Sequence, residues 1–317
     1  MASRFSIILS TPTTIELQAN GALDHAAVIA NLKSHTVAGL QDFNPETKQL
    51  SRWIEVSGTQ QFVQAQLIDA HLRLTTYSQD PLINDAIALR VKHWFDLDTD
   101  LAPINAHLAQ DPLFATQVSQ RPGIRITRHH APFEGTILAV LGQQVTLSTG
   151  RLFAARLVEA FGAAPSAETA EAKPPRSLAA SRLRMFPAAQ KLAATPVDEL
   201  RAAVKLTNSR ARTVSEVAKF FAERGPHSEH VELPPREELA TVYGIGPWTF
   251  DVLAIRAACE KDAFPASDAV LRRILTAAEP GFGLEKNHDG MRVASWSPYR
   301  SYAAQRLWAR LNDQASG

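Results

Sequence analysis

The chain has 317 residues, of which 45% are hydrophobic and 21% are charged, a balance typical of a globular protein with a substantial core. Its longest apolar runs, such as Phe5–Leu9 and Ile137–Leu141, are far too short to span a bilayer, and the first lacks the cleavage pattern of a signal peptide. The single cysteine, Cys259, excludes an internal disulfide and any all-cysteine zinc or iron–sulfur site. The net charge of +1 and the pI of about 8.0 leave DNA binding open. We therefore expect a cytoplasmic protein without a membrane anchor.

Short strands are predicted in the first part of the chain. Five segments between residues 4 and 78 are rich in β-branched and aromatic side chains, and several alternate apolar with polar residues. These segments are Phe5–Leu9, Thr14–Leu17, Trp53–Val56, Phe62–Leu67 and Leu72–Tyr77. One helix, Asp24–His35, is expected among them, and a second is expected from Pro81 towards Trp94.

The pattern changes from strand to helix at about Leu101, and helical periodicity continues from there to the end. Such segregation predicts an α+β protein, with an N-terminal antiparallel sheet domain over residues 1–110 and an all-helical domain over residues 111–317. The Ala-, Pro- and Glu-rich stretch near residues 163–178 is aperiodic, which predicts a flexible surface loop between two helices.

Several histidines and arginines are candidate binding residues. His227 and His230 are spaced i, i+3, but they lie in a polar stretch without further ligands, which favours a solvated loop over a metal site. Arg210 and Arg212 are equally compatible with a solvated helix start and with a phosphate contact. No Walker or Rossmann glycine pattern is present, so no nucleotide cofactor is implied.

Residues 236–259 predict two helices separated by a glycine-rich break. The first covers Arg236–Tyr243, and the second begins behind Pro247, where a first-turn proline is favourable. Between them, Gly244 and Gly246 can reach positive φ and let a phosphate approach the backbone closely. The amides of the break and of the second helix would then point at one phosphate, assisted by the helix dipole. Taken alone, the segment favours an ordinary helix–turn–helix corner.

An aspartate, Asp268, follows twenty positions after Trp248, directly before a helix expected over Ala269–Leu275. An isolated Asp in this place is most simply an N-cap. The same carboxylate could stay ionised beside the helix dipole and face a cationic reaction centre. Spacing alone leaves both interpretations open.

The surrounding motifs decide between them by resemblance. The string Leu-x-x-Val-Tyr-Gly-Ile-Gly-Pro-Trp-Thr, followed by Asp-x-Phe-Pro-x-x-Asp-x-x-Leu-Arg-Arg, resembles the helix–hairpin–helix glycosylase superfamily, and more narrowly its DNA-3-methyladenine glycosylase II (AlkA-type) branch. Segments within Pro122–Val145, Phe186–Arg212 and Arg300–Trp308 resemble the same branch. The resemblance covers residues 122–310 well and the first hundred residues loosely, through their strand-rich layout.

The resemblance implies a DNA-binding surface around the hairpin. Gly244, Ile245 and Gly246, with Thr249, match residues that hold a DNA phosphate, often together with a monovalent cation at the hairpin backbone. Gln144 matches the residue that wedges into the gap left by an extruded nucleotide. Read without the family, Gln144 is equally a helix-surface glutamine.

The resemblance also implies the chemistry. Asp268 matches the catalytic aspartate, and Trp248 stands where bifunctional relatives carry a Schiff-base lysine, so hydrolysis without lyase activity is expected. A base must leave the stack to be reached, which costs a few kcal/mol. Trp248 and Trp308 could then stack it, with cation–π attraction for an alkylated, positively charged base, while Asp268 stabilises the oxocarbenium-like sugar or activates water. Trp53 and Trp296 are expected to pack in the core instead.

The pocket departs from the family in its aromatic content. Positions that are often aromatic hold Val252 and Ala309 here, and Asn31 or a neighbour replaces an aromatic residue of the first domain. If these positions line the pocket, it is roomier and poorer in π-surface, which leaves the range of substrates open.

The expected function is a monofunctional DNA glycosylase that removes alkylated purines from duplex DNA by base flipping. It needs no cofactor or obligate protein partner and acts as a monomer in the bacterial cytoplasm, at the nucleoid. Two alternatives remain: a non-catalytic lesion-binding module, which has no need of the Asp268 carboxylate, and a glycosylase for a deaminated base. The missing lysine and the missing cysteine cluster argue against the oxidised-guanine and adenine-mismatch branches.

Overall fold

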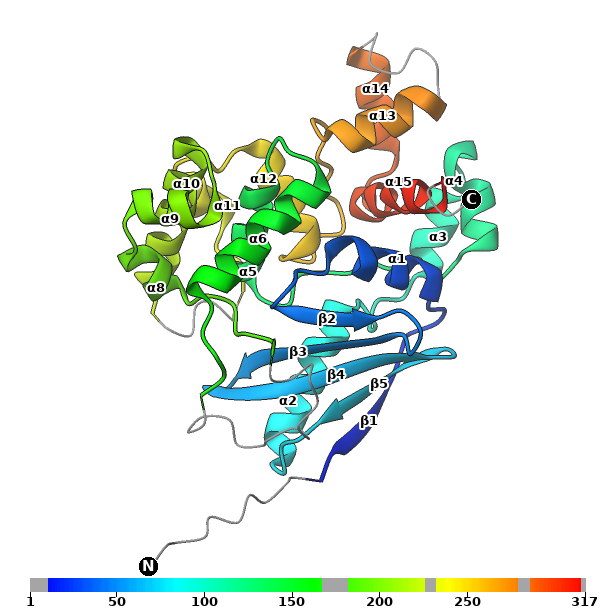
Figure 1. Ribbon diagram of the computed structural model, residues 1–317. Coiled ribbons are helices and arrows are strands. Elements are labelled where there is room, and N and C mark those ends of the chain that lie inside the picture. The colour runs from blue at the N-terminus through cyan, green and yellow to red at the C-terminus, as the bar shows by residue number, and fades with distance from the viewer. Residues whose placement is uncertain (1–10, 167–181, 226–231, 279–285, 315–317) are drawn as a thin grey trace, which may run out of the picture.

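The computed structural model describes residues 11–166, 182–225, 232–278 and 286–314. The first part forms a five-stranded antiparallel sheet in the order β1-β5-β4-β3-β2 (Figure 1). The strands are β1 Thr13–Gln18, β2 Gln41–Asn44, β3 Gln49–Val56, β4 Thr59–Ile68 and β5 His71–Thr76. Trp53 on β3 lies directly opposite Phe62 on β4, with ring centroids 5.2 Å apart, and this aromatic pair favours the observed register.

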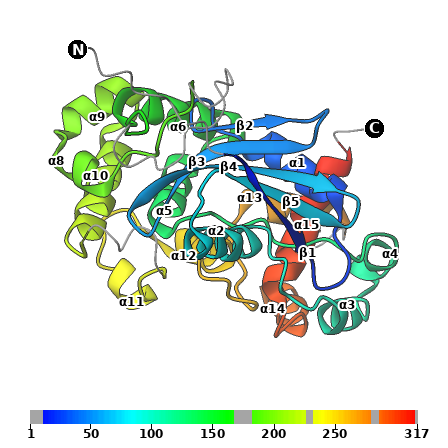
Figure 2. The ribbon, with the colours of Figure 1, turned by 90° about the horizontal axis from the view of Figure 1, so that it is seen from below.

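Two helices belong to the sheet region. Helix α2 (Pro81–Trp94) packs across one face of the sheet, as the view from below shows (Figure 2), and buries Ile87 there. Helix α1 (His25–His35) follows β1 in the chain and adds to the same core. Each helix begins behind an aspartate, Asp80 or Asp24, whose carboxylate accepts a first-turn amide at 2.8 Å.

The rest of the chain is helical. The other helices whose bounds the structure describes are α3 Ala102–Leu108, α4 Pro112–Gln120, α5 Pro132–Gly142, α6 Leu147–Phe161, α8 Ala189–Ala194, α9 Val197–Val204, α10 Asn208–Ala222, α11 Arg236–Leu239, α12 Pro247–Arg256, α13 Ala269–Ala278, α14 Lys286–Ser295 and α15 Arg300–Gln314. None of the helices in the described ranges is long and apolar enough to cross a membrane.

Buried apolar side chains of the described residues gather into three large cores. One lies between the sheet, α1 and α2, and a second lies among α5, α6, α8 to α10 and the hairpin. The third joins Ile104 of α3 and Phe114 of α4 to Leu307 of α15, and Figure 1 shows these helices side by side. The expected boundary at residue 110 falls between α3 and α4, and the division into two domains there remains a prediction.

The expected α+β class is confirmed. The helices predicted near residues 24–35 and 81–94 are present, and four predicted strands correspond to β1, β3, β4 and β5. The short strand β2 was not predicted, because four residues are too few to show a clear alternation of apolar and polar side chains. Phe5–Leu9 and most of the expected loop at 163–178 lie outside the described residues. Trp53 and Trp296 are core residues, 5% and 1% exposed.

The two hairpin helices are shorter than predicted. Helix α11 ends at Leu239 rather than Tyr243, because the Thr241 hydroxyl donates to the Glu238 carbonyl (2.7 Å) as the chain turns. Helix α12 ends at Arg256 rather than near Cys259, because the Arg256 carbonyl accepts the His129 amide (2.7 Å) instead of continuing the helix, and Cys259 itself has a φ of +60°.

Candidate active site

The hairpin between α11 and α12 depends on two different glycines. Gly244 has a φ of +80°, and a Cβ there would lie 2.1 Å from Oγ1 of Thr213 on α10, so the position requires glycine. Gly246 is the N-cap of α12, and a Cβ there would meet nothing within 4 Å. Between them, Ile245 is 8% exposed and anchors the hairpin in the helical core. The start of α12 is thus held firmly and remains approachable by a phosphate.

The turn between α5 and α6 is tied to this hairpin. Gln143 donates from Nε2 to the Gly244 carbonyl and to Oγ1 of Thr249, both at 3.0 Å, while its own carbonyl accepts from Arg210. Arg210 is therefore a half-buried residue that ties the turn to α10, a role that neither of its two predicted interpretations included, and its phosphate contact stays a prediction. Thr249 is 2% exposed, so its hydroxyl supports the hairpin, and its expected DNA contact stays a prediction for its backbone alone.

Gln144 projects from the same turn. It is exposed and has a φ of +53°, a left-handed conformation that directs it differently from its neighbour Gln143. Leu147, at the start of α6, is 51% exposed close by. Arg212 is also exposed, and its guanidinium carbon lies 4.2 Å from the ring centroid of Tyr243. The wedge role of Gln144 and a phosphate contact of Arg212 remain predictions, for which exposure is the first requirement.

Asp268 is both a helix cap and a site residue. Its Oδ1 accepts the amides of Val270 (3.1 Å) and Leu271 (3.0 Å) at the start of α13. Its Oδ2 accepts the indole N–H of Trp248 at 2.9 Å, and the indole N–H of Trp308 lies 3.5 Å from Oδ1. The carboxylate is half-buried, and these donors fix its orientation.

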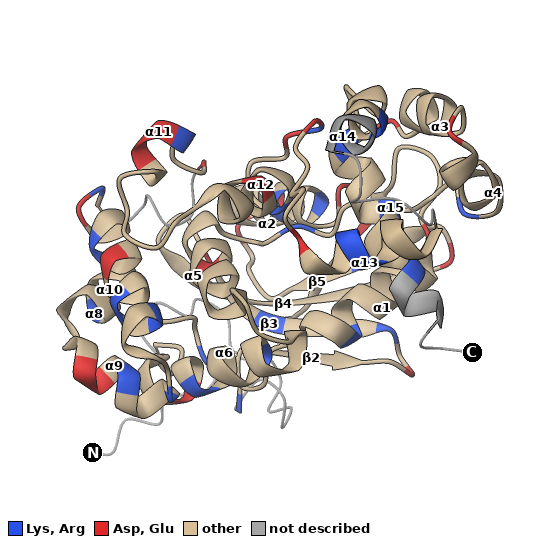
Figure 3. Ribbon diagram, turned by 90° about the horizontal axis from the view of Figure 1, so that it is seen from above, with Lys and Arg blue, Asp and Glu red and all other residues tan. Residues whose placement is uncertain are grey.

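A cavity of about 360 Å³ opens in front of this carboxylate. The structure brings the expected pocket residues together on its wall, from helices distant in sequence: Asn31, Trp248, Val252, Asp268, Trp308 and Ala309. These residues lie on α1, α12 and α15 or, for Asp268, directly before α13, and these four helices converge in Figures 1 and 3. Asn31, Val252 and Ala309 add no aromatic ring to this wall, but Trp94 and three histidines also line the cavity, so the expected shortage of aromatic surface stays a prediction.

Arg256 is a cavity residue that the sequence reasoning missed. It follows Trp248 and Val252 at i+8 and i+4 on α12, so helical spacing alone puts the three on one face. Its Nη1 donates to the Thr127 carbonyl at 2.6 Å, and its guanidinium carbon lies 4.9 Å from the Trp308 ring centroid. Burial lowers its pKa to about 10, and the charge of Asp268 opposes that shift.

Two histidines on the opposite wall were also missed as pocket residues. Burial, and then the charge of Arg256, lowers the pKa of His129 to about 4. Burial, and then the charge of Arg52, lowers the pKa of His130 to about 3. Both rings therefore line the cavity in their neutral form at physiological pH. The pattern His129-His130 gave no hint of this, because their burial depends on the sheet domain.

A buried ion pair closes the same wall. Arg52 on β3 and Glu134 on α5 form two parallel hydrogen bonds, at 3.1 and 2.7 Å, with side chains 2% and 5% exposed. Burial would raise the pKa of Glu134, but the Arg52 guanidinium outweighs it and holds that pKa well below its usual range. Arg52 also lies over the Trp94 ring, 5.4 Å from its centroid. The pair locks the sheet against the helical part.

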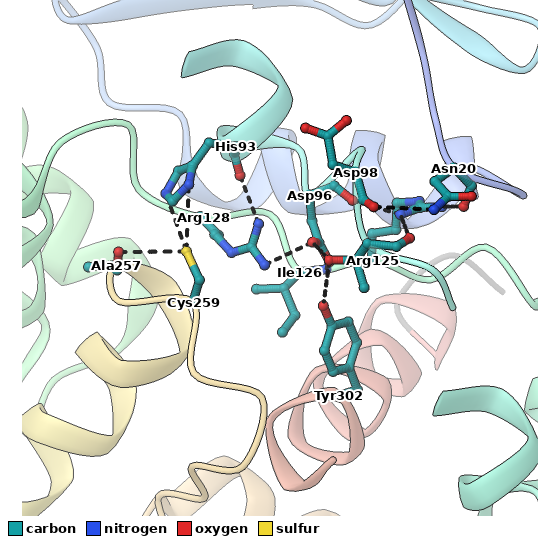
Figure 4. Close-up of polar contacts among 11 residues, drawn as sticks. Asn20, His93, Asp96, Asp98, Arg125, Ile126, Arg128, Ala257, Cys259 and Tyr302 are labelled. Atoms are coloured by element: carbon teal, nitrogen blue, oxygen red, sulfur yellow. Dashed lines mark hydrogen bonds and ion pairs between the residues drawn. The ribbon is translucent and has the colours of Figure 1, made fainter. Parts of the chain in front are cut away.

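A second polar network joins three parts of the chain beside the cavity (Figure 4). Asp96, 1% exposed, accepts from Arg128 at 2.8 Å and from the hydroxyl of Tyr302 on α15 at 2.9 Å. The Arg128 amide donates to the Trp94 carbonyl at 2.8 Å. Residues 127–130, which line the cavity, are thereby fixed between the sheet domain and α15.

The remaining surface carries few further signs of a site. Within the described ranges, no group of three or more His, Cys, Asp or Glu side chains could hold a metal ion, and His227 and His230 lie outside those ranges. Basic and acidic residues are interspersed over the face seen in Figure 3, which carries α6, α12 and α13. Phosphate binding there would depend on local devices such as the hairpin.

Comparisons with known proteins agree with this arrangement. Residues 14–131 match the AlkA N-terminal domain family, and residues 137–284 match the HhH-GPD superfamily of base excision DNA repair proteins. A 3-methyladenine DNA-glycosylase from Archaeoglobus fulgidus has a similar structure, with a TM-score of 0.75 at 17% identity over 92% of this chain and 96% of that one. This likeness shows the shared fold.

Two bacterial relatives are similar in sequence. A Mycobacterium tuberculosis protein named as a probable bifunctional transcriptional activator/DNA repair enzyme AlkA is 32% identical over 228 residues, which is 70% of this chain and 42% of that protein. The match thus covers less than half the length of that relative. A DNA-3-methyladenine glycosylase of Bacillus subtilis is 26% identical over 72% of this chain and 73% of its own. The chain belongs to the helix–hairpin–helix superfamily of base excision DNA repair proteins, in its AlkA-type branch.

Proposed function

We propose that this chain is a monofunctional DNA glycosylase that hydrolyses the N-glycosidic bond of alkylated purines in duplex DNA, such as 3-methyladenine and 7-methylguanine. The observation that carries the proposal is the carboxylate of Asp268, held at the cavity by the Trp248 indole at 2.9 Å. The bacterial relative named as a DNA-3-methyladenine glycosylase supports the same chemistry. The reaction would be the first step of base excision repair.

The cavity suits a flipped base in front of Asp268. Extrusion of the nucleotide costs a few kcal/mol, and less for a damaged base. Inside, the faces of Trp248 and Trp308 offer stacking, while Asp268 faces the sugar. As the C1′–N bond lengthens, positive charge develops on the sugar, and the carboxylate stabilises it and orients the attacking water.

The absence of a cavity amine supports hydrolysis without strand cleavage. A lyase reaction needs a neutral amine to form a Schiff base with the sugar. By the resemblance to the family, Trp248 matches the position at which bifunctional relatives carry lysine, and none of the described cavity residues is a lysine. The product would therefore be an intact strand with an abasic site.

Binding to duplex DNA would rest on the hairpin. The α12 N-terminus behind Gly246 would receive one phosphate, with or without a monovalent cation, and Gln144 would fill the gap in the duplex. Both are single local contacts, which fits a chain with a net charge of only +1. We propose that the protein acts on damaged DNA as a monomer in the bacterial cytoplasm.

The test is release of free bases from duplexes that each contain one lesion: 3-methyladenine, 7-methylguanine, ethenoadenine, hypoxanthine or uracil. Release of the methylated purines without strand cleavage is expected. The variant Asp268→Asn should lose about 100- to 1,000-fold in rate, whereas its fold should persist because asparagine is an equally good N-cap.

Asp198→Asn is the matched control, since that side chain is 90% exposed on α9. Full activity of Asp268→Asn would refute the assigned mechanism, and tight lesion binding without any base release would support a non-catalytic module. Release of hypoxanthine or uracil alone would identify a glycosylase for deaminated bases.

A further inference from the structure

Arg256 places a positive charge inside the same cavity as Asp268. Only one hydrogen bond, from Nη1 to Thr127, joins its guanidinium to the described residues, so Nε and Nη2 keep free donors. The side chain is half-buried and lines the cavity. With a pKa of about 10 it remains charged at physiological pH. A cation with unused donors at a substrate cavity calls for a role beyond packing.

Trp308 contacts both charged side chains, Asp268 and Arg256. Its indole N–H lies 3.5 Å from Oδ1 of Asp268, while the guanidinium of Arg256 lies over its ring at 4.9 Å from the centroid. A base stacked along this wall would have the anion near its sugar and the cation near its ring. The negative charge of the cavity would therefore lie near the sugar, which gains positive charge in the reaction, and the positive charge near the base, which gains negative charge.

Hydrolysis of the N-glycosidic bond moves charge in that direction. The bond between C1′ and the base nitrogen breaks, and its electron pair leaves with the base. Water adds hydroxide to C1′ and releases a proton, which ends on the base or in solvent. The sugar thus gains positive charge and the base becomes more negative by one unit, whatever charge it had at the start.

We propose that Arg256 is a further catalytic residue that faces the departing base and stabilises the negative charge it gains, so that the cavity also accepts damaged bases that are neutral. This role rests on the proposed glycosylase function. For a neutral base, Arg256 has no charge to meet in the bound substrate but attracts the anion that forms. For a cationic alkylated base, it repels the bound substrate, and that repulsion disappears as the base becomes neutral.

The other ionisable side chains considered at the cavity do not cancel the positive charge that Arg256 presents to a bound base. His129 and His130 are neutral, and Arg52 and Arg128 each face a buried carboxylate. Arg151 also lines the cavity, but its guanidinium donates to the Lys33 and Ser34 carbonyls at the end of α1 (both 3.1 Å), where the helix dipole offsets its charge. Among the described residues, the Arg256 guanidinium has one hydrogen-bond acceptor, the neutral Thr127 carbonyl, and one carboxylate within electrostatic range, that of Asp268.

The two kinds of base give different kinetic signatures in Arg256→Met, which removes the charge and keeps much of the length. Single-turnover rates and half-saturation concentrations would be measured on duplexes with hypoxanthine, a neutral base, and 7-methylguanine, a cationic one. The ratio of rate to half-saturation concentration should fall on the order of 30-fold for hypoxanthine. For 7-methylguanine it should stay within about threefold, because Arg256 acts equally on the free state and the transition state.

Arg256→Lys keeps the charge and should restore most of the hypoxanthine activity. Arg73→Met, on β5 in a surface pair with Glu16, is the control for net charge and should leave both ratios unchanged. Equal losses on the two bases, with no rescue by lysine, would show that Arg256 only supports the fold and would overturn the inference. So would a wild-type protein that releases 7-methylguanine but no hypoxanthine. A wild-type protein that releases no base at all would instead refute the proposed function.

Discussion

The two walls of the cavity are built in opposite ways. The wall formed by α12, α13 and α15 presents groups that can contact a bound ligand. They are the Asp268 carboxylate, the Arg256 donors and two indole rings. The wall formed with the sheet domain holds the Arg52–Glu134 pair and two neutral histidines, whose charges are cancelled or suppressed. In the proposed mechanism the first wall acts on the ligand, whereas the second joins the sheet to the helical part through the Arg52–Glu134 pair. Substitutions should separate these roles.

Glu134→Ala should produce the largest loss of stability. It leaves the Arg52 guanidinium buried without its partner, which costs about 3 to 5 kcal/mol in the free energy of unfolding. Denaturant titration would measure this loss, with Glu16→Ala as the control, because that surface carboxylate is 42% exposed and solvent screens its ion pair. The molecules that stay folded should still show Asp268-dependent base release. Normal stability of Glu134→Ala would show that the wall does not depend on this pair.

His130 should make stability depend on pH. Its folded pKa of about 3 lies below the ordinary value of 6.5, so protons bind the unfolded chain first as the pH falls. The stability it contributes is complete above about pH 6.5 and is lost as the pH falls towards 3. Between pH 7 and pH 5 this amounts to about 2 kcal/mol. His130→Gln should remove that part of the slope in denaturant titrations at the two pH values, and an unchanged slope would contradict the assignment.

Trp248→Phe should give the smallest effect of the series, and on activity alone. Phenylalanine keeps an aromatic face for the base but removes the N–H that donates to Oδ2 of Asp268 at 2.9 Å. The excision rate should fall about tenfold, the equivalent of one hydrogen bond to a charged group. Trp53→Phe makes the same chemical change in the sheet, 5% exposed and away from the cavity, and should leave the rate unchanged. Equal rate losses in the two variants would break the proposed separation of walls.

The sequence predicted the first wall better than the second. Asp268, Trp248 and the glycines of the hairpin lie within one stretch of 25 residues, where cap chemistry and glycine conformation carry a local signal. Asn31, Val252 and Ala309 were also predicted as pocket positions, through the resemblance, and all three line the cavity. Arg256 could have been found by extending the i, i+4 spacing by one further turn of α12.

The second wall left no comparable signal. Arg52 and Glu134 are 82 positions apart, and an arginine in a strand is ordinarily a solvent-facing residue. His129 and His130 become neutral only because a sheet, an arginine and α12 surround them, which no local pattern encodes. For the same reason the third core, which joins α3 and α4 to α15, could not be read from spacing. Contacts of this kind depend on the assembled fold.

The position of α15 also affects the order in which the protein becomes functional during synthesis. This helix leaves the ribosome after every other described element, yet it supplies Trp308 to the cavity and Tyr302 to the buried carboxylate of Asp96. The sheet and the hairpin can fold earlier, as domains commonly do from the N-terminal side. A nascent chain that already displays the hairpin would therefore carry an unfinished pocket, and base recognition would begin only once α15 docks.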